Sequence, residues 1–252
     1  MKNVTTFDAR CCKRKSRMPA KLDRWQSLTG LFLALFMACH MIFTSTILLG
    51  PEAFDWVIGK AEMDFWFEGG LPWVTSLVTL GVLVLFLTHG FLAMRKLPAN
   101  YLQLAQFLSH RQLLSHTGTT LWWLQCLSGL ALLVLGGAHL LMILTSKETL
   151  SATTAAYRFV HGGLGSFYLL LLLVSTLHAG IGAYRLILKW CPIEASEPKT
   201  LQRRIRNVRS EVFGVFGVLT LLALWADFTY IKHGKNLSPL SIQERLTLAK
   251  TK

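Results

Sequence analysis

Four histidines stand alone inside long apolar stretches of this 252-residue chain, and they are His40, His89, His139 and His178. A neutral imidazole nitrogen is the commonest side-chain ligand for metals. An ionisable ring inside a membrane span is costly and usually functional. One such histidine alone would more often be hydrogen-bonded to a neighbouring helix. One in each of four consecutive stretches favours a shared role as metal ligands.

Five apolar stretches must position these rings. We expect them over residues 28–49, 71–94, 121–144, 157–190 and 212–231. A helix crosses a bilayer with about 20 apolar residues, and lipid offers no partner for backbone polar groups. The fold class is therefore all-α, a polytopic bundle of five transmembrane helices. The fourth stretch is longer than a perpendicular span requires, so we expect it to tilt, with Gly162, Gly163 and Gly165 allowing a bend.

Composition supports this class, with 52% hydrophobic residues, 15% charged residues and a mean hydropathy of +0.44. The net charge of +13 does not indicate nucleic acid, because the charges cluster between the apolar stretches as topology determinants do. The five cysteines form no CxxC or CxxCH pattern. We therefore expect no covalent c-type haem, iron–sulfur cluster or disulfide framework within the chain.

Charge between the stretches alternates in sign. Residues 1–24, 95–118 and 191–209 are basic, residues 51–70 carry a net charge of −4, and residues 145–156 are neutral. The positive-inside rule places the basic segments in the cytoplasm, so the N-terminus is inside and the C-terminus outside.

We expect three parts along the chain. A basic cytoplasmic tail covers residues 1–24, a five-helix transmembrane domain covers 25–232, and a polar tail covers 233–252. Within the domain, the acidic and aromatic segment 51–70 is typical of a short interfacial helix.

Depth sorts the four histidines into two pairs, at about 1.5 Å of rise per residue. His40 and His139 lie roughly 14 and 8 Å from the outer edge, whereas His89 and His178 lie roughly 8 and 15 Å from the inner edge. Two imidazoles from different helices at one depth can supply both axial nitrogens of a haem iron. The sequence therefore predicts two haems stacked across the membrane. Small neighbouring residues would make room for the macrocycles: Gly90, Gly136, Gly137, Ala138, Ala179 and Gly180.

Several longer motifs carry a family resemblance. They are KSRMPAKLDRW (15–25), GLFLALFMACH (30–40), FWFEGG (65–70), HGFLAMRKLP (89–98), TTLWW (119–123) and the segment 177–190. Through them the chain resembles the dihaem cytochrome b membrane-anchor subunit of quinol:fumarate reductase, in the succinate dehydrogenase/fumarate reductase superfamily. The resemblance spans roughly residues 15–232.

The resemblance implies two b haems in a bacterial cytoplasmic (inner) membrane. His40 and His139 would hold the haem distal to the cytoplasm, and His89 and His178 the proximal one. Menaquinol would be oxidised to menaquinone near the outer face, with Glu62 accepting protons. An ordinary solvated acid is the alternative for Glu62. Electrons would pass inward to an iron–sulfur subunit and a flavoprotein subunit, which reduces fumarate in anaerobic respiration. The complexes would pair as a dimer of heterotrimers, and this chain would carry no fumarate site.

The same resemblance suggests donors for the haem propionates. Gln26, Ser27, Trp122 and Lys189 lie at inner helix ends and would serve the proximal haem, whereas Arg158 would serve the distal haem. Each could instead be an interfacial anchor.

One position departs from the family. Where well-known dihaem fumarate reductases carry a glutamate two residues before the fourth haem histidine, this chain has Thr176. That glutamate is thought to carry a compensating proton, so we expect either electrogenic electron transfer or a different proton route.

The departure also leaves open the succinate:menaquinone reductase direction. The sequence is compatible with two further functions. One is the cytochrome b subunit of a different respiratory dehydrogenase or hydrogenase, and the second is a haem-free transporter with buried histidines.

Overall fold

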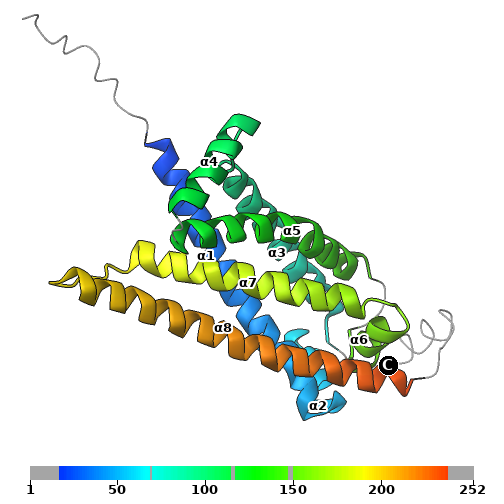
Figure 1. The fold of residues 1–252 in the computed structure, drawn as a ribbon. Coiled ribbons are helices and arrows are strands. Elements are labelled where there is room, and N and C mark those ends of the chain that lie inside the picture. Colours follow the sequence, from blue (N-terminus) through cyan, green and yellow to red (C-terminus); the bar gives the residue numbers. More distant parts are fainter. Residues whose placement is uncertain (1–16, 69, 115–116, 147–149, 238–252) are drawn as a thin grey trace, which may run out of the picture.

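The computed structural model describes residues 17–68, 70–114, 117–146 and 150–237 of the chain, and these residues form a helical bundle (Figure 1). Most of the expected tails, residues 1–16 and 238–252, lies outside the described residues.

Five long helices among the described residues confirm the predicted spans. They are α1 (Met18–Thr44), α3 (Pro72–Met94), α5 (Thr117–Thr145), α7 (Gly165–Trp190) and α8 (Pro198–Lys235). Helix α1 continues into the 3₁₀ helix η2 (Ser45–Leu49). Each is long and apolar enough to cross a bilayer. Large apolar side chains such as Phe32, Phe91 and Leu221 are exposed on the outside of the bundle. Lipid is the solvent that suits such a surface.

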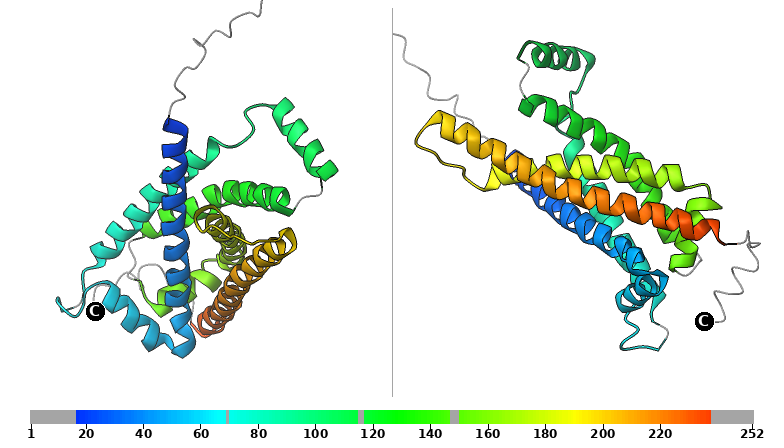
Figure 2. Two further views of the ribbon diagram at one scale, coloured as in Figure 1. Left: turned by 90° about the vertical axis from the view of Figure 1, so that its left-hand side faces the viewer. Right: turned by 60° about the horizontal axis from the view of Figure 1, so that its bottom comes forward.

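The helices pack through a few shared faces. Helix α7 packs against both α5 and α8, and α3 packs against both α1 and α5. Figure 1 shows α7 running between α5 and α8, with α1 crossing behind them, and Figure 2 shows the same bundle from two other sides. The four helices that carry the histidines, α1, α3, α5 and α7, therefore surround a common interior space.

The two ends of the bundle differ in charge. We call the end that holds η2, α2 (Pro51–Ala61) and α6 (Ala152–Val160) the acidic end, because the segment 51–70, which contains α2, carries a net charge of −4. The basic end comprises the first turns of α1 and α8 and the helix α4 (Tyr101–Leu114), which lies far from α2 and α6 (Figure 1). Helix α8 begins at the basic end and reaches the acidic end. The two ends of the described chain therefore lie on opposite sides, as five spans require.

A small buried core closes the acidic end. Its members come from η2, α2, α6 and α8 and are Ile47, Phe54, Ile58, Ala152, Ala156, Ala226 and Tyr230. Gly50, with a φ of 117°, makes the sharp turn into α2, a backbone region open to glycine. The Asp55 carboxylate accepts a hydrogen bond from the Ala152 amide at 2.7 Å, which ties α2 to α6. The interfacial helix predicted within the segment 51–70 corresponds to α2, which covers only the first half of that segment.

The prediction of a single long fourth helix over residues 157–190 is wrong. The structure contains two helices, α6 and α7, separated at residues 161–164. A capping box between Ser151 and Thr154 starts α6, and Gly163 adopts a φ of 66° after it ends. A positive φ lies outside the helical region and is readily adopted only by glycine. The helix therefore ends before Gly163 and a new one begins after it, where only a bend was expected.

Two expected basic loops are partly helical. The segment 95–118 contains α4, and α8 begins at Pro198 rather than near residue 212. Helix α8 has 38 residues, about 57 Å at 1.5 Å per residue. Its first turns therefore project beyond the apolar layer.

Candidate cofactor-binding site

The structure brings the four histidines together as the two pairs that their depths predict. The ring centres of His40 and His139 are 6.4 Å apart, near the acidic end. Those of His89 and His178 are 6.5 Å apart, nearer the basic end. Each pair joins two helices, α1 with α5 and α3 with α7.

These separations suit a metal ion between the rings. A metal–imidazole bond is about 2 Å long and a ring nitrogen lies about 1 Å from the ring centre, so two imidazoles on opposite sides of one ion have centres about 6 Å apart. The rings of the pairs are tilted to each other by 57° and 87°. Rotation about a metal–nitrogen bond moves no donor atom, so neither angle prevents axial ligation.

A cavity of about 1120 Å³ connects the pairs, and all four histidines line it. This volume exceeds the 300–1,000 Å³ typical of a site for one drug-sized ligand. The accessible face of His40 opens to this cavity. The interior therefore has room for large flat cofactors between the paired rings.

Hydrogen bonds define the tautomers of the basic-end pair. His178 Nδ1 lies 3.1 Å from the Gln125 carbonyl oxygen, which can only accept, so Nδ1 carries the proton. The Thr29 hydroxyl donates to the Trp25 carbonyl oxygen at 2.9 Å, so its oxygen accepts from His89 Nδ1 at 3.1 Å. In both rings Nε2 is left as the unprotonated nitrogen, which is the form that a metal binds.

Glycines lie directly against these two rings. A Cβ atom on Gly30 would come within 2.8 Å of the His89 ring, and one on Gly129 within 3.0 Å of the His178 ring. Sequence reasoning missed both glycines. One expected glycine has another role, because Gly180 faces Phe213 and Phe216 of α8 rather than the cavity. Gly137 and Ala138 are also absent from the cavity wall, whereas Gly90, Gly136 and Ala179 line it.

The acidic-end pair has an aromatic setting. The His40 ring stacks with Phe36 at 5.8 Å and with Phe43 at 6.4 Å. The His139 ring meets the edge of Tyr168 at 5.9 Å. Its Nδ1 atom is buried and has no hydrogen-bond partner among the residues that the structure describes.

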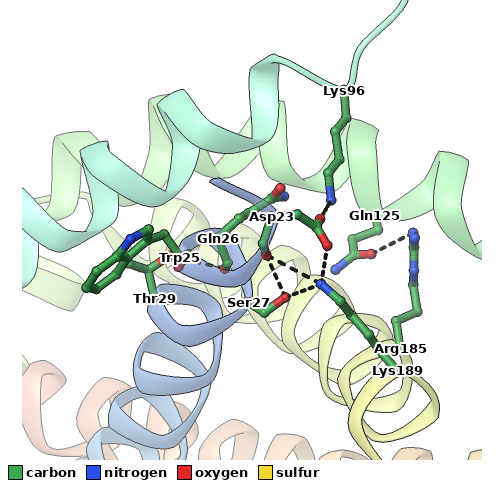
Figure 3. A network of polar contacts seen from close by, with 9 residues as sticks. All are labelled: Asp23, Trp25, Gln26, Ser27, Thr29, Lys96, Gln125, Arg185 and Lys189. Atoms are coloured by element: carbon green, nitrogen blue, oxygen red, sulfur yellow. Dashed lines mark hydrogen bonds and ion pairs between the residues drawn. The ribbon is translucent and has the colours of Figure 1, made fainter. Parts of the chain in front are cut away.

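A polar network, whose members Ser27, Lys96 and Lys189 line the cavity, lies at the basic end (Figure 3). Asp23 on α1 accepts hydrogen bonds from Lys96, just after α3, and from Lys189 on α7. Lys189 also donates to the Ser27 hydroxyl at 2.7 Å. The network thus joins three helices and places two ammonium groups beside the basic-end pair.

The other expected anion-binding residues also line the cavity. Gln26 and Trp122 lie at the basic end, and the Gln26 Oε1 atom is buried without a partner in the described part of the chain. Arg158 lies at the acidic end, where it donates to the Ser146 hydroxyl at 2.6 Å. All five expected residues therefore border the cavity at the predicted ends.

Glu62 lies at the acidic end, just after α2. Its Oε1 atom accepts a hydrogen bond from the Thr75 hydroxyl of α3 at 3.1 Å. Glu62 does not line the cavity itself, but its neighbours Ala61 and Thr75 do. Gly70, with a φ of 69°, folds the following loop back against Glu62. The carboxylate thus lies next to the cavity wall at the acidic end.

Thr176 lies away from this site. Its side chain is buried outside the cavity wall, and its hydroxyl donates to the Leu172 carbonyl oxygen at 2.9 Å. The position therefore offers neither an ionisable group nor a polar group directed at the histidines.

The remaining histidines lie outside the pairs. The Nε2 atom of His161 lies 3.2 and 3.0 Å from the Gly234 and Leu237 carbonyl oxygens. His110 is exposed on α4, and His233 is near the end of α8. His116 lies outside the described residues.

Comparison with known proteins points to one family. A family model described as succinate dehydrogenase/fumarate reductase transmembrane subunit matches residues 105–221. The chain is 43% identical over 222 residues to the fumarate reductase cytochrome b subunit of Wolinella succinogenes, covering 88% of this chain and 86% of that protein. It is 39% identical over 221 residues to the protein of the same name from Helicobacter pylori strain J99, covering 88% and 84%.

Proposed function

The chain belongs to the family of succinate dehydrogenase and fumarate reductase transmembrane subunits, as a fumarate reductase cytochrome b membrane subunit, and we propose that it holds two b haems and oxidises menaquinol. When bound, the two haems supply one-electron transfer between the acidic and basic ends of the bundle. The chain's own residues bind these groups, orient them and accept the protons of the quinol.

The two imidazole pairs are the observation that carries this proposal. Separations of 6.4 and 6.5 Å suit two axial ligands on one iron. His89 and His178 each present Nε2 to the cavity, since their Nδ1 atoms are engaged by Thr29 and Gln125. Such outer partners fix ring orientation and raise ligand basicity.

Charged side chains at both ends suit the haem propionates. The propionates of the basic-end haem would accept hydrogen bonds from Lys189, Ser27, Gln26 and Trp122, of which Lys189 is charged. Those of the acidic-end haem would pair with Arg158. A carboxylate paired with a cation gains a charge-assisted hydrogen bond.

Glu62 is our candidate proton acceptor for menaquinol. A quinol that loses two electrons also releases two protons, and a carboxylate beside the cavity wall can act as a general base. Thr75 holds Oε1 by a single hydrogen bond, so the second oxygen remains available to a proton donor.

We assign the basic end to the cytoplasm of a bacterium, with the chain as a multi-pass protein of the inner membrane. Arg203, Arg204 and Arg206 are exposed on the first turns of α8. This surface would receive the iron–sulfur subunit, which connects to the flavoprotein subunit, and two heterotrimers would pair as a dimer.

A haem count on the purified complex tests the proposal. A pyridine haemochrome assay is expected to find two b haems per chain, and both are expected to be reduced by a menaquinol analogue. Reduction of only one haem would restrict the electron route to one pair. A colourless, folded complex would favour a haem-free transporter, and a dehydrogenase or hydrogenase partner would favour another respiratory complex.

Thr176 leads to a prediction about charge movement. With no ionisable group at this position, electrons that cross from the acidic to the basic end move uncompensated charge. Each charge moved across 100 mV corresponds to about 2.3 kcal/mol. Vesicles containing the complex are therefore expected to become electrically polarised during menaquinol-driven fumarate reduction, measured with a potential-sensitive dye. The absence of any potential, in vesicles shown to be sealed, would contradict the electrogenic version.

A further inference from the structure

Asp227 is the one acidic residue within the apolar segments 28–49, 71–94, 121–144, 165–190 and 212–231 of the sequence. It lies on α8, the spanning helix that contributes no paired histidine, and it lines the cavity. Its Oδ2 atom is buried and has no hydrogen-bond partner within the described part of the chain. A buried charge without a partner is costly in an apolar environment. An ionisable residue at such a position is therefore a candidate for function.

The position of Asp227 along the bundle can be read from its neighbours. The Tyr230 hydroxyl donates to the Thr44 carbonyl oxygen at 3.0 Å, which places these two residues at one level. Asp227 is three residues before Tyr230 and His40 is four residues before Thr44. Because α8 and α1 run toward the same end, both residues lie about one helical turn, or roughly 5 Å, from that level. Asp227 is thus level with the acidic-end pair.

A chain of ring contacts joins the two sides of this region. The ring of His139 meets Tyr168 at 5.9 Å, Tyr168 stacks on Phe159 at 4.7 Å, and Phe159 stacks on Tyr230 at 5.3 Å. Asp227 lies one turn from Tyr230 on the same helix. The ring contacts therefore connect the acidic-end pair to the turn of α8 that carries Asp227, and both border the same cavity.

Four described elements pack against α8, namely α1, α6, α7 and η2. Each of them except η2 contributes a charged or titratable group near Asp227. These groups are His40 on α1, Arg158 on α6, Tyr168 on α7 and Tyr230 on α8 itself, with His139 on α5 and Asp55 on α2 nearby. The Arg158 guanidinium is engaged by Ser146, and the Asp55 carboxylate by the Ala152 amide. No described cation forms an ion pair with Asp227 within 4 Å. Its charge can be balanced by a proton or by a positively charged cofactor.

We propose that Asp227 is a proton-binding group that takes up one proton when an electron reaches the cofactor held by His40 and His139. A b haem with ferric iron carries one net positive charge at its centre, and one electron removes that charge. An ionised Asp227 then loses the positive charge that favoured it and binds a proton, forming a neutral carboxyl group. The electron comes from menaquinol, and the proton comes from the quinol or from water at the acidic end. When the electron leaves, Asp227 ionises again and the proton returns to water at the acidic end, so it does not cross the membrane with the electron.

This inference rests on the proposed haem at the acidic-end pair, and its test separates the two. Haem is first counted in the wild type and in Asp227→Asn, and two haems in both would leave the proposed function intact. The midpoint potential of the acidic-end haem is then titrated between pH 6 and 8. Full coupling changes the ratio of reduced to oxidised haem by about tenfold per pH unit, which is about 59 mV for one electron. We expect a clear slope in the wild type and its loss in Asp227→Asn.

Two matched variants complete the titration. Glu211→Gln removes an exposed acid from the half of the same helix nearer the basic end and is expected to keep the wild-type slope. Asp227→Glu keeps a carboxyl group and is expected to retain most of the slope. An unchanged slope in Asp227→Asn, or the absence of a slope in the wild type, would overturn the proposal.

A second readout needs no variant. Infrared difference spectra of reduced minus oxidised wild type are expected to contain a new carboxylic acid band. That band should shift when the aspartates carry ¹³C at the side-chain carboxyl. If Asp227→Asn fails to assemble, this spectrum still decides, because a band insensitive to the label, or no band at all, contradicts the proposal.

Discussion

Replacement of His178 by alanine is expected to remove one of the two b haems and to leave the other in place. A haem in a bis-imidazole site depends on both axial nitrogens, and alanine supplies none. The same reasoning predicts that His40→Ala removes the other haem, because the two rings belong to different pairs. Haem content should fall from two to about one per chain in each variant, measured by pyridine haemochrome assay. The spectrum that remains should differ between the two variants.

His110→Ala is the matched control for this experiment. His110 is exposed on α4 and does not line the cavity, so the variant is expected to keep both haems. If both variants lost the same haem, the pairing of the rings would be wrong. Loss of both haems by either variant, in protein that still elutes as a complex, would mean that the two sites do not assemble independently.

Gly129→Val gives a milder version of the same test. A Cβ atom at this position would approach the His178 ring to 3.0 Å, so the ring must move while its nitrogen is retained. We expect this variant to weaken only the haem that His178→Ala removes. Gly81→Val adds the same bulk to α3 where nothing lies within 4 Å of the new Cβ atom, and it should behave as the wild type.

Replacement of Glu62 by glutamine is expected to lower menaquinol-driven fumarate reduction about 100-fold or more, which is the usual contribution of a general base. Glutamine has nearly the same shape and can still accept the hydrogen bond from Thr75, but it cannot accept a proton from the quinol. Fumarate reduction with an artificial electron donor, which bypasses this chain, should be unchanged. The haem content should remain at two per chain.

Glu68→Gln serves as the control for Glu62→Gln. Glu68 is an exposed acid in the same segment, so its replacement should leave quinol oxidation within about twofold of the wild type, as for most exposed surface positions. A Glu62→Gln variant that kept near-normal quinol oxidation would show that another group accepts the protons.

The sequence by itself determined the class of fold and the pairing of the histidines. A bilayer of nearly constant thickness forces each apolar stretch into one crossing helix, so distance along the chain becomes depth in the membrane. His40 and His139 therefore share one level, and His89 and His178 another, as the structure has them. The alternating charge of the loops also separated the basic end from the acidic end.

Only the tertiary structure decided what surrounds each ring. Thr29 is 60 residues from His89 in sequence, and the Gln125 carbonyl is 53 residues from His178. Sequence patterns give depth along a helix but not which face it turns toward which neighbour. For the same reason the contacts of Gly30 and Gly129 and the cavity-facing position of Asp227 could not be predicted, although an acid within an apolar stretch was itself visible. The break between α6 and α7 depended on the positive φ of Gly163, because glycines within an apolar stretch permit a break without requiring one.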